Sequence, residues 1–232
     1  MKRLFFVTAI TLAMGFSTLV HAALVDNGGG FIYDTDLNIT LLQDAYYANT
    51  SHYITPAGRD VTTTAGLMTW DEATAWASGL TVGGVTGWRL PRTVDGPYVY
   101  GTDGTTTGGY NITSSEMGHL YYIELGNTAF TQSGYAPPVN KGPFADLLSA
   151  YWSGTEYATD SIFAWYFHFG IGSQSFCAKD YLDLFALAVH DGDVLGNGIV
   201  LPNGPPVPIP GSILLLAPGL VGLAAIRRRL KK

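Results

Sequence analysis

The feature that most constrains the fold is a run of alternating aromatic residues in the last third of the chain. Phe163, Trp165, Phe167 and Phe169 alternate with other residues. A period of two places all four side chains on one face of an extended strand. A strand with such an apolar face has to be covered by other elements. The run therefore predicts a sheet whose aromatic face is buried.

The residues that follow this run predict a three-stranded antiparallel meander. A glycine turn at 170–172 fits a reversal of the chain, because glycine tolerates positive φ. Residues 173–178 then return, and a charged turn follows at 179–183. Apolar residues alternate again over 185–189, which predicts the third strand.

Three segments have the pattern of short helices. Thr69 and Glu72 are spaced as a capping box at the start of a helix over 69–79. A second box, Thr113 with Glu116, predicts a helix over 116–125. Proline at position 143 predicts a third helix, since proline is favoured in the first turn.

Composition supports the same fold class. The chain has 29 glycines, 13% aromatic residues and only 13% charged residues, which is typical of turn-rich β or α+β domains. We predict an α+β globular body over 23–194, with a mostly antiparallel sheet and two or three short helices. Residues 31–45 predict two strands around a turn at 34–36. Residues 93–112, rich in glycine and threonine, predict a long loop that is too polar to pack and is functional or mobile.

The charge of the body is strongly negative. All 18 acidic residues but only five of the 12 basic residues lie between the two ends of the chain, a formal charge of −13. Such a surface repels phosphate backbones, so we expect no nucleic-acid partner. The same charge weakly favours cations, including calcium.

The first 22 residues have the pattern of a secretory signal peptide. A basic start is followed by an apolar core and a small-residue site, which predicts cleavage after Ala22. The alternative is an uncleaved anchor. Either reading predicts that the protein is exported.

The other end has a matching three-part pattern. Residues 195–206 are a Gly/Pro linker, and 207–226 are apolar over about the 20 residues that span a bilayer. The basic residues that follow are expected to stay in the cytoplasm, with the body outside the inner membrane; they include Arg227, Arg228 and Arg229.

This tail, VPIPGSILLLAPGLVGLAAIRRRLKK over 207–232, resembles the PEP-CTERM sorting signal of Gram-negative bacteria in its VPLP-type variant. The resemblance implies recognition by an exosortase, cleavage near the motif, and release or attachment at the cell surface, often in bacteria that make exopolysaccharide. The motif residues are Val207, Pro208, Ile209 and Pro210, with isoleucine where the family usually has glutamate. The alternative is a plain membrane anchor.

The body resembles a bacterial domain of unknown function. GWRLP, SEMGHLYYIELG, YWSGTEY, AWYFHF and ALAVHDGDV occur in this order, as in the Lcl C-terminal-domain-like family. The resemblance implies a fold similar to C-type-lectin-like and sulfatase-modifying-factor domains. Leu187 and His190 depart from the usual tryptophan and arginine. A relative of this family binds sulfated polysaccharides, but the few cations of this body argue against the same ligand.

Few residues form a recognisable chemical motif. The histidines at 52, 119, 168 and 190 lack metal-binding spacing, and we interpret His119 and His168 as structural. Cys177 has no partner cysteine, which excludes an intramolecular disulfide and predicts a buried structural residue rather than a reactive thiol. No serine-nucleophile motif is present.

Three candidate interactions remain. Arg89 with Glu116 is expected to form a buried structural ion pair. Asp191 and Asp193 are candidate calcium ligands, or simply part of a turn. Three tyrosines of the predicted loop either stack on sugar rings or have no role; these are Tyr98, Tyr100 and Tyr110.

The sequence therefore predicts a non-catalytic, exosortase-processed protein of the cell surface or extracellular matrix. It would pass through the inner membrane and recognise a glycan, such as an exopolysaccharide, or another surface component. One alternative is an extracytoplasmic enzyme on a sulfatase-modifying-factor-like scaffold. The other is a purely structural surface protein.

Overall fold

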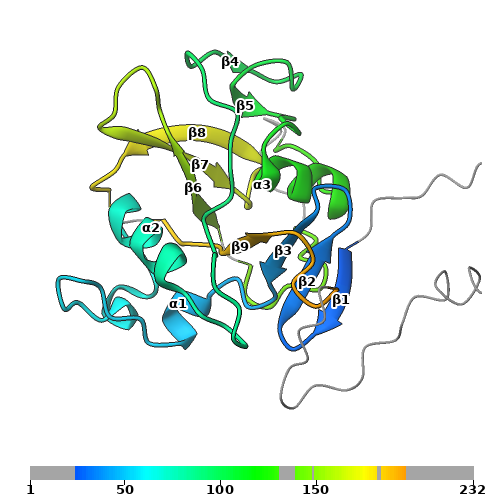
Figure 1. Ribbon diagram of the computed structural model, residues 1–232. Coiled ribbons are helices and arrows are strands. Elements are labelled where there is room, and N and C mark those ends of the chain that lie inside the picture. The colour runs from blue at the N-terminus through cyan, green and yellow to red at the C-terminus, as the bar shows by residue number, and fades with distance from the viewer. Residues whose placement is uncertain (1–23, 131–138, 148, 182–183, 197–232) are drawn as a thin grey trace, which may run out of the picture.

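The computed structural model describes residues 24–130, 139–147, 149–181 and 184–196. This part of the chain is a mixed α+β domain with mostly antiparallel strands and three short helices (Figure 1). The predicted fold class is confirmed at this level. The strands form two sheets rather than the single predicted sheet.

Both predicted targeting segments lie outside the described residues. These include the signal peptide 1–22 with Ala22, most of the linker 195–206, and the tail 207–232 with its motif and basic end. Among the described residues, no helix combines the length and the apolar character that crossing a membrane requires.

The first sheet has four strands. They are ordered β1–β2–β3–β9, all antiparallel, and span Leu24–Gly28, Phe31–Asp34, Ile39–Leu42 and Val189–Asp191. The turn predicted at 34–36 is present between β2 and β3. Asp34 Oδ1 fixes it by accepting the backbone N–H groups of Asp36 and Leu37 at 3.0 and 2.9 Å.

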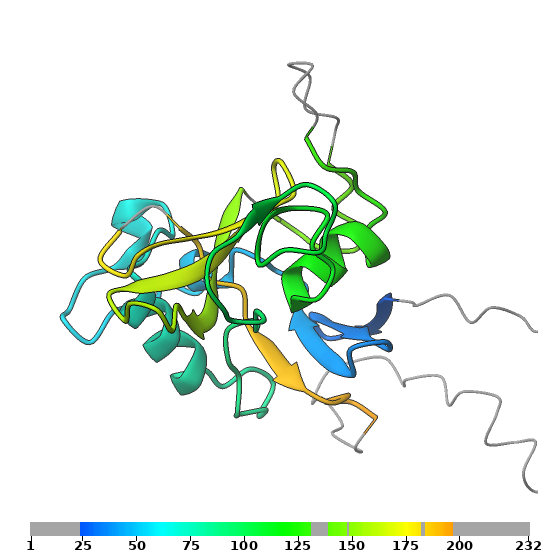
Figure 2. The same cartoon turned by 90° about the horizontal axis from the view of Figure 1, so that it is seen from above.

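The second sheet has five strands. They are ordered β4–β5–β8–β7–β6, with only β4 and β5 parallel, and span Tyr100–Gly101, Gly108–Tyr110, Ser173–Ala178, Phe163–His168 and Ala150–Glu156. The predicted aromatic face is buried: Trp165, Phe167 and Phe169 are at most 1% exposed. Figure 2 shows β1–β3 on the opposite side of the molecule from the helices α1 (Tyr47–Thr50) and α2 (Trp70–Gly79).

The predicted meander is half correct. Strands β7 and β8 pair antiparallel, as expected. The third strand does not follow, because β5 already pairs with the free edge of β8 through Gly109 and Gln174. Instead, Phe185 forms a parallel bridge with Tyr151, and Val189 belongs to β9 in the other sheet.

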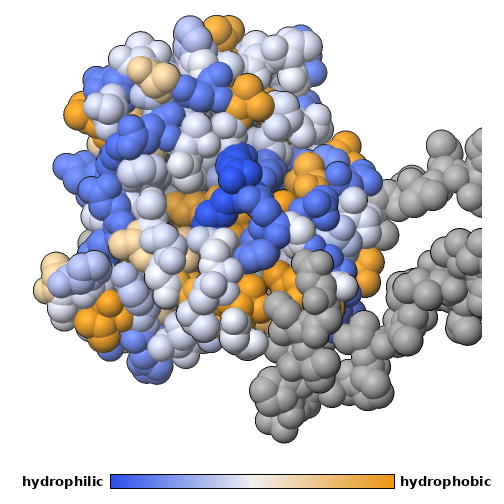
Figure 3. All heavy atoms as spheres, in the orientation of Figure 1, coloured by the Kyte–Doolittle hydropathy of each residue, from blue (hydrophilic) through white to orange (hydrophobic). Residues whose placement is uncertain are grey.

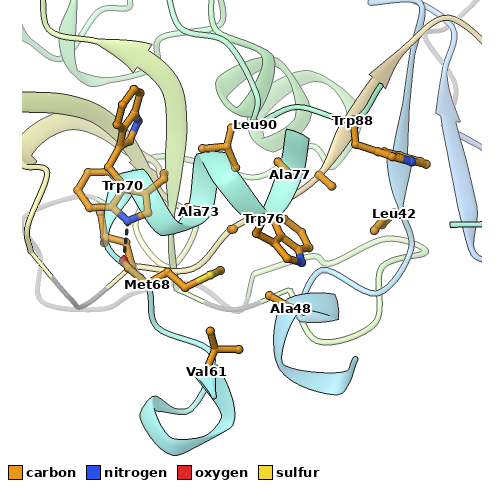
Figure 4. Packing of buried hydrophobic residues seen from close by; sticks show 14 of the residues in the cluster. Leu42, Ala48, Val61, Met68, Trp70, Ala73, Trp76, Ala77, Trp88 and Leu90 are labelled. Carbon is orange, nitrogen blue, oxygen red and sulfur yellow. Dashed lines mark hydrogen bonds between the residues drawn. The ribbon is translucent and has the colours of Figure 1, made fainter. Parts of the chain in front are cut away.

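The best-predicted element is α2, over Trp70–Gly79. Thr69 Oγ1 accepts the N–H of Glu72 at 3.4 Å, and Glu72 Oε2 accepts the N–H of Thr69 at 3.0 Å, so the capping box is complete. The buried side of the helix packs in the first core cluster (Figure 4), which includes Ala73, Trp76 and Ala77.

Replacing Thr69 with alanine is expected to lower the free energy of unfolding by about 1 kcal/mol, because one orphan amide of α2 loses its acceptor. Urea unfolding followed by tryptophan fluorescence measures the change. Ser78→Ala is the control, since that exposed hydroxyl lies at the other end of the same helix. Equal losses in the two variants would contradict a role for the cap.

The other two predicted helices need correction. The second begins at Glu116 as predicted, as α3 (Glu116–His119) followed by a π-helical turn over Leu120–Glu124, but its N-cap is Ser115 rather than Thr113. Glu116 is therefore the first residue of the helix and cannot close a capping box, and its carboxylate binds Arg89. No helix forms after position 143 among the described residues, since Ala145 pairs with Gln43 and Ala45 through backbone bonds of 2.9 and 3.0 Å.

Two shorter elements complete the described fold. Helix α1 spans Tyr47–Thr50, and a 3-10 turn spans Val61–Thr64. Arg89 forms one isolated bridge with Val189, made by two backbone bonds of 2.9 and 2.8 Å. This bridge places the Arg89 side chain at the junction of the first sheet and α3.

Candidate functional site

The candidate binding site is a group of aromatic and apolar side chains on the 93–112 segment, which we call the tyrosine surface. Its members are Tyr98, Val99, Tyr100 and Tyr110. Tyr100 is 58% exposed and Val99 is 53% exposed. The rings of Tyr100 and Tyr110 lie edge to face with centroids 6.4 Å apart. Figure 3 shows hydrophobic residues among hydrophilic ones at the top of the molecule, where β4 and β5 lie in Figure 1.

The segment that carries this surface is anchored to the second sheet. Asp95 Oδ1 accepts the indole N–H of Trp165 at 2.8 Å, and the Tyr98 amide donates to the Tyr157 hydroxyl at 3.2 Å. The Tyr98 ring packs on Trp165 and Phe176, with centroids 6.2 and 5.1 Å apart. The prediction of a loop too polar to pack is therefore wrong, because the Tyr98 ring packs on two aromatic rings and the partly buried carboxylate of Asp95 binds the indole of Trp165.

The tip of the segment is held by its own threonines and glycines. Thr107 Oγ1 accepts the Val99 amide at 2.9 Å and donates to the Pro97 carbonyl at 2.7 Å. Gln174 of β8 donates to the Thr107 carbonyl at 2.8 Å. Gly109 faces Gly101 across the β4–β5 pair. Each contact fixes the backbone that displays Tyr100.

These side chains can stack on a ring and form hydrogen bonds at the same time. An exposed tyrosine offers an apolar face and a phenol that donates and accepts. Burial, followed by the nearby phenols of Tyr100 and Tyr98, raises the pKa of Tyr110 above its ordinary value. The Tyr110 phenol therefore stays protonated and neutral at physiological pH. Such a surface fits an uncharged or weakly charged ring.

The side chains of Arg89 and Glu116 form a bidentate ion pair. Arg89 Nη1 and Nη2 donate to Glu116 Oε2 and Oε1 at 2.8 and 2.7 Å. Both side chains are less than one-fifth exposed. Arg89 also binds Asp191, and Glu116 accepts the Arg92 amide at 2.7 Å. The pair therefore connects α3 to β9 and has a structural role.

The two candidate calcium ligands are used by other partners. Asp191 accepts from Arg89 and Arg92, and hydrogen bonding to Arg89 lowers the pKa of its carboxyl. Asp193 accepts the Asn27 amide at 2.9 Å and the Leu195 N–H at 3.1 Å. Calcium at Asp191 would have to compete with two guanidinium groups, so the geometry argues against this candidate site.

The side chains of Cys177 and His168 line one pocket of about 330 Å³, together with Tyr166 and Tyr181. Burial raises the pKa of the Cys177 thiol to about 12, so it is a thiol and a poor nucleophile at neutral pH. Burial lowers the pKa of His168, whose Nδ1 accepts the Gly170 N–H at 3.1 Å. Cys177 is only partly buried, so the prediction of a buried residue is not met, whereas the raised pKa agrees with the prediction that its thiol is unreactive.

Two histidines lie at contacts that the sequence did not indicate. The ring of His190 packs against Trp88, with centroids 5.6 Å apart. His119 Nε2 lies 3.3 Å from Glu124 Oε1. No motif in the sequence indicates this second contact, or the contact of Asp95 with Trp165 across 70 positions. The only signal for the latter is that a buried indole N–H needs an acceptor.

Comparisons with known proteins gave no match to a family model, a curated protein or a solved structure.

Proposed function

We propose that the protein is an exported, non-catalytic component of the cell surface or extracellular matrix that binds a glycan through the tyrosine surface. The observation that carries the proposal is Tyr100, which is 58% exposed beside the edge-to-face ring of Tyr110. Exposed apolar side chains that gather in one patch often mark an interaction site, and tyrosine is enriched where proteins bind partners.

The rigidity of the segment supports this function. Asp95, Tyr98 and Thr107 each fix its backbone through contacts with the second sheet or within the segment. A surface that is already ordered loses little conformational freedom when a ligand binds. Weak contacts with a few sugar rings can then add up to useful affinity for a polymer.

The charge of the body indicates the kind of glycan. With a formal charge of −13 between the two ends, the body repels strongly anionic polymers. The ligand that fits is therefore a neutral polymer rather than a sulfated one. Binding to such a polymer should depend little on salt, because no large set of ion pairs forms.

The tail supports the location. Residues 207–232 resemble a PEP-CTERM signal, so the proposed partners are an exosortase, the inner membrane in transit, and exopolysaccharide at the destination. The body resembles the Lcl C-terminal-domain-like family, with its lectin-like fold. The proposed function rests on both resemblances and on the geometry of the tyrosine surface.

Replacing Tyr100 with alanine is expected to weaken glycan binding about tenfold, since a central aromatic contact is commonly worth more than 1 kcal/mol. Affinity electrophoresis of the full-length protein through gels that contain the host's exopolysaccharide measures this effect. Tyr181→Ala is the matched control, because Tyr181 is 49% exposed outside the tyrosine surface.

The wild type and the control should be retarded equally, and the Tyr100 variant should be retarded less. Equal retardation of all three proteins would place binding elsewhere on the molecule. No retardation of the wild type would contradict glycan binding and would favour the structural or enzymatic alternatives.

A further inference from the structure

Three side chains from distant parts of the chain meet between the first sheet and the π-helical turn. They are Asp34 at the end of β2, His119 at the end of α3, and Glu124 at the end of the turn. One potential ligand atom of each lies within 4.8 Å of those of the other two. His119 Nε2 lies 3.3 Å from Glu124 Oε1.

The π-helical turn brings two of them together. In an α-helix, residues five apart point about 140° away from each other, because each residue turns by about 100°. Here Leu125 donates to the carbonyl of Leu120 at 2.9 Å, a bond between residues five apart. This widened turn places Glu124 beside His119. Such turns are rare and are found frequently at functional sites.

The third side chain is held from the opposite side. Asp34 Oδ1 accepts two amides of the β2–β3 turn, which fixes the carboxylate and leaves Oδ2 for other partners. Asp34 is fully buried, and the Glu124 side chain is 1% exposed. These two groups are therefore shielded from water by the first sheet and the turn.

The polar atoms of this cluster are poorly satisfied. Among the described residues, Asp34 Oδ2, His119 Nε2 and Glu124 Oε1 are buried and form no well-aligned hydrogen bond. Buried polar atoms without partners are rare and costly, and several in one place indicate a missing ligand.

The charge of the cluster indicates the sign of that ligand. Asp36 lies nearby, its Oδ2 3.8 Å from His119 Nε2, so three carboxylates surround one imidazole. A single imidazolium would leave two of the three carboxylate charges uncompensated, whereas a divalent cation bound to the neutral imidazole would leave only one.

We propose that Asp34, His119 and Glu124 bind a divalent transition-metal ion, of which zinc fits the ligand set best. One imidazole nitrogen and two carboxylate oxygens are common zinc ligands, with bonds of about 2.0–2.2 Å. In a tetrahedral site, two such ligands lie about 3.3 Å apart, which is the distance between His119 Nε2 and Glu124 Oε1. Any pair of ligand atoms near the 4.8 Å limit of the cluster would have to approach by up to about 1.5 Å when the ion binds.

The geometry also provides an entrance and a fourth position. The His119 side chain is 16% exposed and that of Asp36 is 45% exposed, so this side of the cluster opens to solvent. A water molecule or the Asp36 carboxylate would complete the coordination there. The competing interpretation is an internal ion pair between imidazolium and Glu124, which needs no metal.

Zinc titration by calorimetry separates the two interpretations. The full-length protein is purified in a mild detergent, stripped with EDTA and titrated with zinc chloride. The wild type is expected to bind one equivalent, and Glu124→Gln is expected to bind at least about 100-fold more weakly, because loss of a direct ligand exceeds the loss of a second-sphere contact. Glu156→Gln is the matched control and should bind as the wild type does, since Glu156 lies outside the cluster in an ion pair with Lys179.

His119→Gln is a second variant, and it changes a side chain that is not fully buried. It should also lose the zinc site, and zinc should raise the thermal midpoint of the wild type but of neither cluster variant. Two outcomes would overturn the proposal. One is that the wild type binds no zinc. The other is that both cluster variants bind zinc as tightly as the wild type, which would mean adventitious binding elsewhere on the chain. Circular dichroism of each variant confirms that it is folded before titration.

Discussion

Replacement of Arg89 by methionine is expected to lower the free energy of unfolding by about 3 kcal/mol, because it leaves the carboxylate of Glu116 largely buried without its cation. The methionine keeps much of the volume of the arginine stem, so the loss reports the charge rather than a cavity. Arg89 donates to Glu116 through both Nη atoms and also binds Asp191. Urea unfolding followed by tryptophan fluorescence measures the change.

A control and a double variant isolate the ion pair. Arg92→Met removes an arginine that is 61% exposed and lies 3.4 Å from Asp191, and it should cost less than about 0.5 kcal/mol. Adding Glu116→Gln to the Arg89 variant should recover part of the loss, since the unpaired charge disappears. Equal losses for the Arg89 and Arg92 variants, or no recovery in the double variant, would contradict a stabilising buried pair.

The Asp191 carboxylate adds only a weak pH dependence to this network. The hydrogen bond from Arg89 lowers its pKa in the folded state. Its contribution to stability is therefore present above the unfolded-state pKa and is lost as the pH falls through the folded-state value. Because the Asp191 side chain is 61% exposed, solvent screens most of this contribution.

Local patterns in the sequence were sufficient to predict the elements that depend on neighbouring residues. The capping box of Thr69 and Glu72 placed the start of α2, and the aromatic alternation placed β7 with its buried face. The turn after Asp34 followed from its turn-forming residues. In each case, one short-range interaction determines the local geometry.

Elements that depend on distant partners were not predictable in this way. The segment 185–189 alternates like a strand of the meander, but the edge of β8 is occupied by Gly109 of β5. Nothing near 185 in the sequence reveals this competitor. The same reason explains why the packing of the 93–112 segment was not predicted. Its polar composition does not indicate the hydrogen bond between Asp95 and the indole of Trp165.

The candidate metal cluster shows the limit of motif spacing. His119 and Glu124 are five residues apart. On an α-helix this spacing would place the two side chains on different faces, whereas the π-helical turn places them side by side. Asp34 joins them from the first sheet. A search for metal motifs with α-helical spacing therefore excludes His119, although the folded chain surrounds it with carboxylates.

The second large effect concerns Gly109, where alanine is expected to destabilise the protein by about 3 kcal/mol and to remove the tyrosine surface. Gly109 has a φ of +102°, and a Cβ atom there would lie 1.9 Å from the carbonyl oxygen of Gly101. The unfavourable φ costs about 1–2 kcal/mol, and the overlap with backbone adds a similar amount. Strands β4 and β5 would have to separate, because a backbone oxygen cannot rotate away as a side chain can.

The consequence for binding follows from the position of this pair at the edge of the second sheet. Separation of β4 from β5 moves Tyr100 away from Tyr110, whereas β6, β7 and β8 keep their own pairing. The Gly109 variant should therefore remain folded in circular dichroism, unfold at lower urea and lose most of its retardation in gels with exopolysaccharide. Gly96→Ala is the matched control, because its Cβ would meet only a Thr107 methyl group at 3.4 Å. Full retardation of the Gly109 variant would show that the paired arrangement of the two tyrosines is not needed for binding, and the glycan site would then have to lie elsewhere on the body.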